Sequence, residues 1–123
     1  MATVLIVDDS PTEIHAYQQM LEKNGYKVEA ATDGETSLQK AAELQPDVIL
    51  MDVVMPGMNG FQATRQLNKT PETANIPVII ITTKDQETDR VWGLRQGARD
   101  YVVKPVKEED LISRVQSCLN GSA

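Results

Sequence analysis

Five side chains whose chemistry suits metal and phosphate binding lie at the ends of short apolar runs. Asp8 and Asp9 directly follow one run, and Asp52 directly follows another. Thr82 and Lys104 follow two later runs. Carboxylates can hold a divalent cation and attack phosphorus, whereas a hydroxyl and an ammonium can bind phosphate oxygens. Together these residue types indicate chemistry on a phosphoryl group.

The three aspartates predict a magnesium site. Carboxylates that converge repel one another and raise each other's pKa unless a cation lies among them. Ligation by oxygen alone, with room for water and a phosphate, favours Mg²⁺. A lone pair such as Asp8-Asp9 more often serves as a turn or cap. Asp52, at the equivalent end of another run, makes the metal site the better explanation.

The other two residues complete a site for phosphoryl transfer, which needs a positioned nucleophile, a metal ion and donors for the phosphoryl oxygens. Asp52 can be the nucleophile, and Lys104 and Thr82 can bind the oxygens. Taken singly, Thr82 would be a helix cap and Lys104 a solvated charge, but their shared edge favours the site. The Lys104-Pro105 bond is either cis, which would aim the lysine inward, or merely the approach to the last helix.

An alternation of short apolar strands with longer helical periodicities predicts an α/β fold around a doubly wound parallel sheet. The expected strands cover residues 3–7, 27–31, 48–51, 77–81 and 100–103, and the expected helices cover 11–23, 35–44, 61–69, 85–96 and 107–119. A capping box at Ser10-Pro11-Thr12-Glu13 begins the first helix. Five strands in the order 2-1-3-4-5, flanked by five helices, place ligands beyond the carboxyl ends of strands 1 and 3. The aspartates lie there.

Length and composition predict one globular domain over residues 1–123, and no output domain is expected. Hydrophobic residues make up 41% of the chain and charged residues 24%, and the apolar runs are too short to cross a bilayer. The net charge of −6 argues against nucleic-acid binding. No segment resembling a signal peptide precedes the first run, so a cytoplasmic location is expected. We also expect a monomer.

Three other side chains are assigned ordinary structural roles. Cys118, the only cysteine, lies on the apolar stripe of the last expected helix and should pack there. His15, the only histidine, is expected at the surface. Trp92 is expected to pack in the core or in a groove, with an exposed interaction face as the alternative.

Four motifs together resemble the response-regulator receiver family, of which CheY is a single-domain member. They are Val-Asp-Asp at 7–9, Met-Asp-Val-Val-Met-Pro-Gly-Met-Asn-Gly at 51–60, Thr-Thr at 82–83 and Asp-Tyr-Val-Val-Lys-Pro at 100–105. The resemblance implies a CheY-like fold in which Asp52 is the phosphoacceptor. It also implies that Asp8, Asp9, Asp52 and the backbone carbonyl of Val54 bind the metal.

The same resemblance implies a switch that responds to phosphorylation. It assigns Thr82 and Tyr101 as the switch pair and Lys104 as the lysine that binds phosphate. On this hypothesis, phosphorylation of Asp52 draws Thr82 inward and Tyr101 fills the space that the threonine leaves.

Residues 8–13, 60–67 and 82–93 resemble, more narrowly, PilH-type regulators of type IV pilus twitching motility. This implies that a chemotaxis-like histidine kinase is the phosphodonor and that a motility or pilus protein acts downstream. The output would be a phosphorylation-dependent protein contact or the draining of phosphoryl groups from a shared kinase. A different chemotaxis or signalling pathway is the alternative.

The main rival function is a magnesium-dependent phosphatase that uses Asp52 to turn over small phosphoesters. Enzymes of this aspartyl-phosphate type place a second acid two residues after the nucleophile, where this chain has Val54, and they carry a lid domain. A flavin-binding module of the same fold would need glycine and hydroxyls in its first loop, which is acidic here. We therefore expect a signalling domain, not an enzyme, that catalyses only its own phosphorylation and dephosphorylation.

Overall fold

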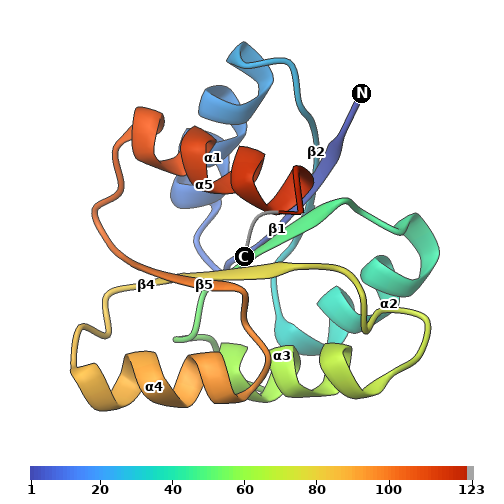
Figure 1. The fold of residues 1–123 in the computed structure, drawn as a ribbon, viewed down its shortest axis with the longest axis vertical. Helices are drawn as coiled ribbons and strands as arrows, with labels where there is room; N and C mark the ends of the chain where they lie inside the picture. Colours follow the sequence, from blue (N-terminus) through green and yellow to red (C-terminus); the bar gives the residue numbers. More distant parts are fainter. Residues whose placement is uncertain (122–123) are drawn as a thin grey trace.

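The computed structural model describes residues 1–121 and contains a five-stranded parallel sheet between two layers of helices (Figure 1). In chain order the elements are β1 (Thr3–Val7), α1 (Pro11–Lys23), β2 (Lys27–Ala31), α2 (Gly34–Leu44), β3 (Val48–Met51), α3 (Gly60–Lys69), β4 (Val78–Thr82), α4 (Glu87–Arg95), β5 (Asp100–Val103) and α5 (Glu108–Leu119). The strand order β2-β1-β3-β4-β5 confirms the predicted doubly wound fold. Within residues 1–121, none of the helices combines the length and apolar character that crossing a bilayer requires.

Each face of the sheet buries its own apolar cluster, because successive strand residues point to opposite faces. Helices α1 and α5 cover one face, and α2, α3 and α4 cover the other (Figure 1). The first cluster includes Val4, Ile6, Leu50, Ile79, Val102, Leu21 and Leu111, and the second includes Leu5, Val7, Met51, Ile80, Tyr101, Ala41 and Leu67. Burial on both faces explains the continuous apolar runs of the sequence. Cys118 packs in the first cluster as predicted, and His15 is exposed as predicted.

Three elements, β4, α4 and α5, begin later than predicted, and α5 begins at Glu108 because Lys107 is its N-cap. β4 begins at Val78 because Pro77 has no N–H to donate to the ladder, although its carbonyl accepts a bond from the N–H of Ile49 at 3.0 Å. α4 begins at Glu87 because Gln86 is its N-cap, and the Gln86 N–H donates to the Asp89 carboxylate at 3.3 Å. β4 is thus shifted by one residue, so that it ends at Thr82, whereas α4 and α5 begin only two residues and one residue later than predicted.

The capping box predicted at the start of α1 is only half formed. Ser10 Oγ accepts a hydrogen bond from the Glu13 N–H at 3.3 Å, as the motif requires. The Glu13 carboxylate does not return a bond to the Ser10 N–H, which instead donates to Asp8 Oδ1 at 2.9 Å. The side chain of Glu13 lies 2.7 Å from the ammonium of Lys104. The prediction of a reciprocal box is therefore wrong, because a buried cation attracts the carboxylate more strongly than a backbone donor does.

Backbone hydrogen bonds extend the sheet ladder into the predicted site. The N–H of Asp52 donates to the Val7 carbonyl at 2.9 Å, and the N–H of Asp8 donates to the Ala31 carbonyl at 3.1 Å. At the other side of the sheet, the N–H of Lys104 donates to the Thr82 carbonyl at 2.8 Å. The side chains of Asp8, Asp52 and Lys104 are therefore attached to backbone that the hydrogen bonds of the sheet hold in place.

Candidate functional site

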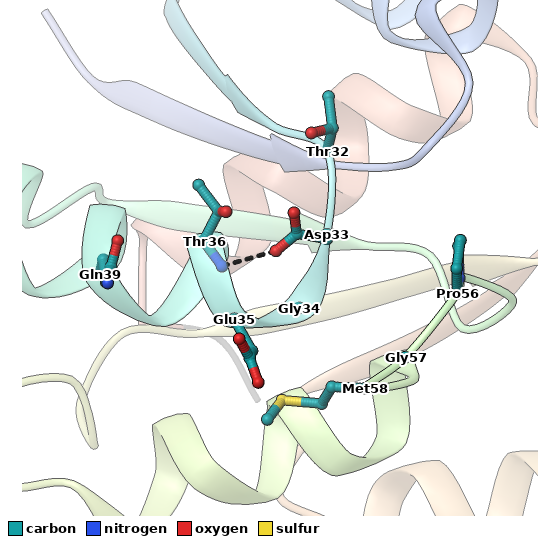
Figure 2. A pocket seen from close by; sticks show the side chains of 9 residues that line it. All are labelled: Thr32, Asp33, Gly34, Glu35, Thr36, Gln39, Pro56, Gly57 and Met58. Atoms are coloured by element: carbon teal, nitrogen blue, oxygen red, sulfur yellow. Dashed lines mark hydrogen bonds between the residues drawn. The ribbon is translucent and has the colours of Figure 1, made fainter.

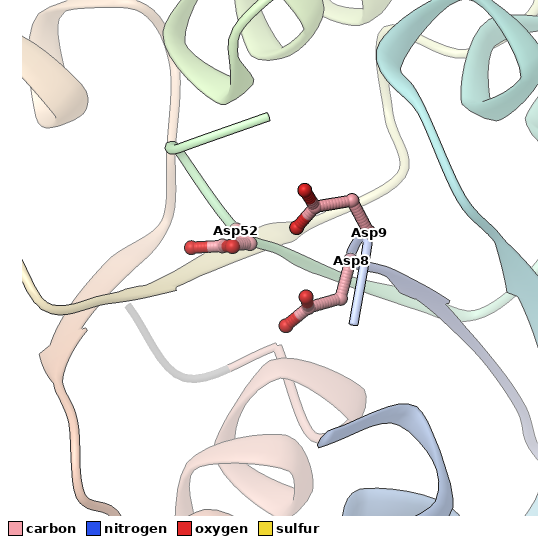
Figure 3. Close-up of side chains that lie close together, drawn as sticks. All are labelled: Asp8, Asp9 and Asp52. Atoms are coloured by element: carbon pink, nitrogen blue, oxygen red, sulfur yellow. The ribbon is translucent and has the colours of Figure 1, made fainter. Parts of the chain in front are cut away.

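The carboxylates of Asp8, Asp9 and Asp52 converge beyond the ends of β1 and β3 (Figure 3). One oxygen from each lies within 4.8 Å of an oxygen from the others. Asp8 is 2% exposed and Asp52 is 8% exposed, whereas Asp9 is exposed to solvent. The strand register explains the convergence, because Val7 pairs with Met51 and the aspartates follow these two residues directly. The cluster is therefore open to solvent through Asp9 and closed beneath it.

Lys104 lies on the buried side of this cluster. Its Nζ atom is 3.3 Å from Asp8 Oδ2, 3.7 Å from Asp52 Oδ1 and 2.7 Å from Glu13 Oε1, and its side chain is only 10% exposed. The Lys104–Pro105 peptide bond is cis, which was one of the two alternatives that the sequence left open. Glu13 is the residue of this site that sequence reasoning missed, since its place in a capping motif concealed its role.

Burial and charge together shift the pKa values of these groups. Burial, opposed by Lys104 and reinforced by Asp8, raises the pKa of the Asp52 carboxyl to about 6. Burial also raises the pKa of Asp8, against the effects of the Ser10 N–H and Lys104. For Lys104, burial lowers the pKa, but the neighbouring Glu13, Asp52 and Asp8 outweigh burial and raise it. The Lys104 ammonium therefore offsets only part of the effect of burial on the pKa of Asp8 and Asp52.

The donor set fits a hard divalent cation. Three carboxylates offer only oxygen, one of them faces solvent, and burial raises the pKa of Asp8 and Asp52 in spite of the neighbouring Lys104. Mg²⁺ is held by one or two carboxylates and keeps several waters, which an open cluster allows. The N–H of Val53 donates to Asp52 Oδ1 at 2.9 Å, so that backbone fixes one oxygen of the central acid. Val54 follows in the loop with its side chain 58% exposed, and its carbonyl remains a predicted ligand.

Thr82 and Tyr101 lie at the α4 side of the same edge. Thr82 ends β4 and is fully buried, and its Oγ1 accepts a hydrogen bond from the Lys84 N–H at 3.3 Å. Tyr101 is 5% exposed, and its hydroxyl donates to the Lys84 carbonyl at 2.8 Å. A side chain at Gly93 would lie 2.9 Å from the tyrosine ring, which shows how closely α4 approaches it. The ring is thus already buried, with its hydroxyl bonded to the backbone of Lys84, and the switch role of Thr82 and Tyr101 stays a prediction.

A depression of about 570 Å³ lies away from the carboxylate cluster, between the start of α2 and the loop after β3 (Figure 2). Its lining residues are Thr32, Asp33, Gly34, Glu35, Thr36, Gln39, Pro56, Gly57 and Met58. Asp33 caps α2 by accepting a hydrogen bond from the Thr36 N–H at 2.7 Å. The lining carries two acids and no cationic side chain, and nothing in it provides a nucleophile paired with a base. This depression therefore supports no chemistry of its own.

Trp92 departs in part from its predicted position. Its side chain is 48% exposed on α4, next to Val91, which is 40% exposed. One part of the indole lines a depression of about 300 Å³ together with Phe61 and Arg65. Packing in the core is therefore wrong, and packing in a groove is right only for that part. Gly93 is the residue of α4 that faces the Tyr101 ring, and its helix neighbour Trp92 lies about 100° around the helix axis from it.

Comparison with known proteins places this site in a family. The family model for the response regulator receiver domain matches residues 4–116 of this chain. Protein PilH of Pseudomonas aeruginosa is 60% identical over 121 residues, which cover 98% of this chain and 100% of PilH.

Solved structures agree with this match. Chemotaxis protein CheY4 of Vibrio cholerae superposes with a TM-score of 0.91 at 35% identity, covering 97% of this chain and 99% of that one. The receiver domain of a Pseudomonas aeruginosa sensor histidine kinase, solved with a magnesium ion coordinated in its active-site cleft, gives a TM-score of 0.90 at 30% identity, covering 97% of this chain and 98% of that one. Sequence and fold lead to the same assignment: the chain belongs to the family of response regulator receiver domains.

Proposed function

We propose that this domain is a phosphorylation-controlled signalling switch in which Asp52 accepts a phosphoryl group from a histidine kinase with the help of Mg²⁺. The observation that supports this most is the position of the Asp52 carboxylate, which lies beside the carboxylates of Asp8 and Asp9 and 3.7 Å from the ammonium of Lys104. A nucleophilic carboxylate, a cation site and a phosphate-binding cation thereby meet at one edge of the sheet.

Each residue of the site has a role in the transfer. Asp52 attacks phosphorus with a carboxylate oxygen, and the donor nitrogen leaves with the electrons of its bond to phosphorus. Asp8 and Asp9 hold the cation, with the Val54 carbonyl as a further ligand. Bound Mg²⁺ supplies positive charge where phosphoryl transfer brings anions together. Lys104 and Thr82 receive the phosphoryl oxygens from two other strand ends.

The similarity to PilH supports a place in type IV pilus twitching motility, with a chemotaxis-like histidine kinase as phosphodonor. The output would be a phosphorylation-dependent contact with a motility or pilus protein, or the draining of phosphoryl groups from a shared kinase. The domain would act in the cytoplasm as a monomer and catalyse only its own phosphorylation and dephosphorylation. A receiver serving another chemotaxis or signalling pathway is the second candidate, because the site residues are common to both.

Phosphoryl transfer from a kinase tests the proposed function. The purified protein is incubated with Mg²⁺ and a pilus-system histidine kinase that carries radioactive phosphate, and transfer of the label is followed over time. We expect label on the wild type, none on Asp52→Asn, and none in the presence of EDTA. A labelled Asp52→Asn variant would contradict the acceptor assignment. Faster labelling by a kinase from another pathway would contradict the place in twitching motility.

Magnesium affinity provides a separate prediction. Replacing Asp9 with asparagine removes the solvent-facing carboxylate of the cluster and should weaken Mg²⁺ binding by about tenfold or more. Isothermal titration calorimetry measures this directly. Glu43→Gln is the matched control, because it removes one negative charge from the exposed surface of α2. Equal affinity in the wild type and Asp9→Asn would exclude Asp9 as a ligand.

A further inference from the structure

The shortest contact of Lys104 with an acid is with a residue outside the carboxylate cluster. Glu13 Oε1 lies 2.7 Å from Lys104 Nζ, compared with 3.3 Å for Asp8 and 3.7 Å for Asp52. The lysine side chain is 10% exposed and that of Glu13 is 38% exposed, so the pair lies at the rim of the site. Lys104 thus binds most closely to an acid that neither accepts phosphate nor belongs to the metal cluster.

The local structure shows that this contact is built rather than incidental. Glu13 lies in the first turn of α1, where its N–H satisfies the Ser10 cap at 3.3 Å. Its carboxylate takes no part in capping α1, because the Ser10 N–H donates to Asp8 instead. The side chain therefore points across to the loop after β5 and meets Lys104. A depression of about 370 Å³, lined by both residues and by Tyr17 and Pro105, gives the carboxylate room to move away.

The charges of the site determine how the contact between Glu13 and Lys104 responds when a phosphoryl group arrives. The site already combines the carboxylates of Asp8, Asp9, Asp52 and Glu13 with one ammonium. An incoming phosphoryl group adds about two negative charges, and its oxygens need Lys104 as a donor. Glu13 competes with those oxygens for the same ammonium.

We propose that Glu13 is a positioning residue that holds Lys104 in the unphosphorylated domain and releases it to the phosphoryl group, so that Glu13 restrains phosphorylation. This role rests on the proposed function, because it concerns the lysine that serves the Asp52 acceptor. Glu13 acts through Lys104 and touches neither the phosphoryl group nor the metal ion.

The rate of phosphorylation by a small donor tests this role. When phosphoramidate is the donor, an Asp52 oxygen forms the new bond to phosphorus. The P–N bond breaks, and its electron pair stays on the protonated nitrogen, which leaves as ammonia. With saturating Mg²⁺, Glu13→Gln should be phosphorylated about threefold to fivefold faster than the wild type, as measured by intact mass over time. The Ser10 cap uses only the backbone N–H of residue 13, so the variant keeps its helix start.

Two comparisons make the result specific. Glu22→Gln removes the same charge from the exposed surface of α1, about 14 Å further along the helix, and should leave the rate unchanged. In a Lys104→Ala background, Glu13→Gln should have no effect on the rate, because the residue through which Glu13 acts is gone. An effect that persists without Lys104 would show simple repulsion and overturn the proposal.

The contact itself can be observed without phosphorylation. In ¹⁵N-edited NMR spectra, the Lys104 ammonium should exchange its protons faster with water in Glu13→Gln than in the wild type or Glu22→Gln. An unchanged exchange rate, or a Glu13→Gln variant phosphorylated no faster than the wild type, would overturn the role of Glu13 alone. A wild type that gains no phosphoryl group would instead remove the proposed function and this role with it.

Discussion

Replacing Gly60 with alanine should lower the free energy of unfolding by about 3 kcal/mol. A Cβ atom at this position would overlap the carbonyl oxygen of Asp52 and lie 2.8 Å from both the Asp52 carbonyl carbon and Val53 Cα. All three are backbone atoms, so no side-chain rotation relieves the overlap. Gly60 is also the first residue of α3, and its N–H donates to the Val53 carbonyl at 3.0 Å. The helix start and the acceptor loop must therefore separate.

Urea unfolding followed by circular dichroism measures this loss, and Gly57→Ala is the matched control. Gly57 lies in the same loop with a φ of +73°, and nothing lies within 4 Å of the position its Cβ would take. Its replacement should cost only the backbone strain of a positive φ, about 1 kcal/mol. Equal losses for the two variants would contradict the argument from close packing. Because the overlap falls on Asp52 itself, Gly60→Ala should also slow phosphorylation, whereas Gly57→Ala should not.

The fold could be predicted because local signals agree with one another. Apolar runs at β1, β3 and β4 have no alternation, which only a doubly covered parallel sheet explains. Gly25, with a φ of +89°, lies between α1 and β2, and a glycine at this position is a local signal for the end of a helix. Once the strands are known, their common edge brings the aspartates together. Strand register, not a long-range signal, therefore accounts for the successful prediction of the cluster.

The predictions that failed concern contacts between elements that lie far apart in the sequence. Glu13 matches a capping motif locally, and its partner Lys104 lies far away in the sequence, near the other end of the chain. Trp92 lies on a helix whose closest approach to the sheet is set by Gly93 against Tyr101. In each case the competing partner is found only when the elements pack. A useful sequence signal for Glu13 would have been an acid one helical turn beyond the aspartates, facing the same edge.

In buffer without divalent cations, Asp52→Asn should be more stable than the wild type by roughly 2 to 3 kcal/mol at about pH 8. Burial raises the pKa of Asp52 from 3.8 to about 6, so the folded protein binds this proton more tightly than the unfolded chain does. The folded wild type therefore loses stability as the pH rises from about 4 through about 6, where the carboxylate becomes charged. Asparagine has the same shape and never ionises. Its advantage should be complete above about pH 6 and absent near pH 4.

Urea unfolding at about pH 4 and about pH 8, with EDTA present, tests whether Asp52→Asn is more stable than the wild type only at the higher pH. Glu43→Gln again controls for net charge, because its carboxylate is exposed on α2 and its removal should change stability little at either pH. Adding Mg²⁺ should then stabilise the wild type more than Asp52→Asn, since a bound cation stabilises only the folded state that holds it. An Asp52→Asn variant that is less stable than the wild type without Mg²⁺ would show that Lys104 already compensates the acid. The need for a cation at the acceptor site would then lose its electrostatic basis.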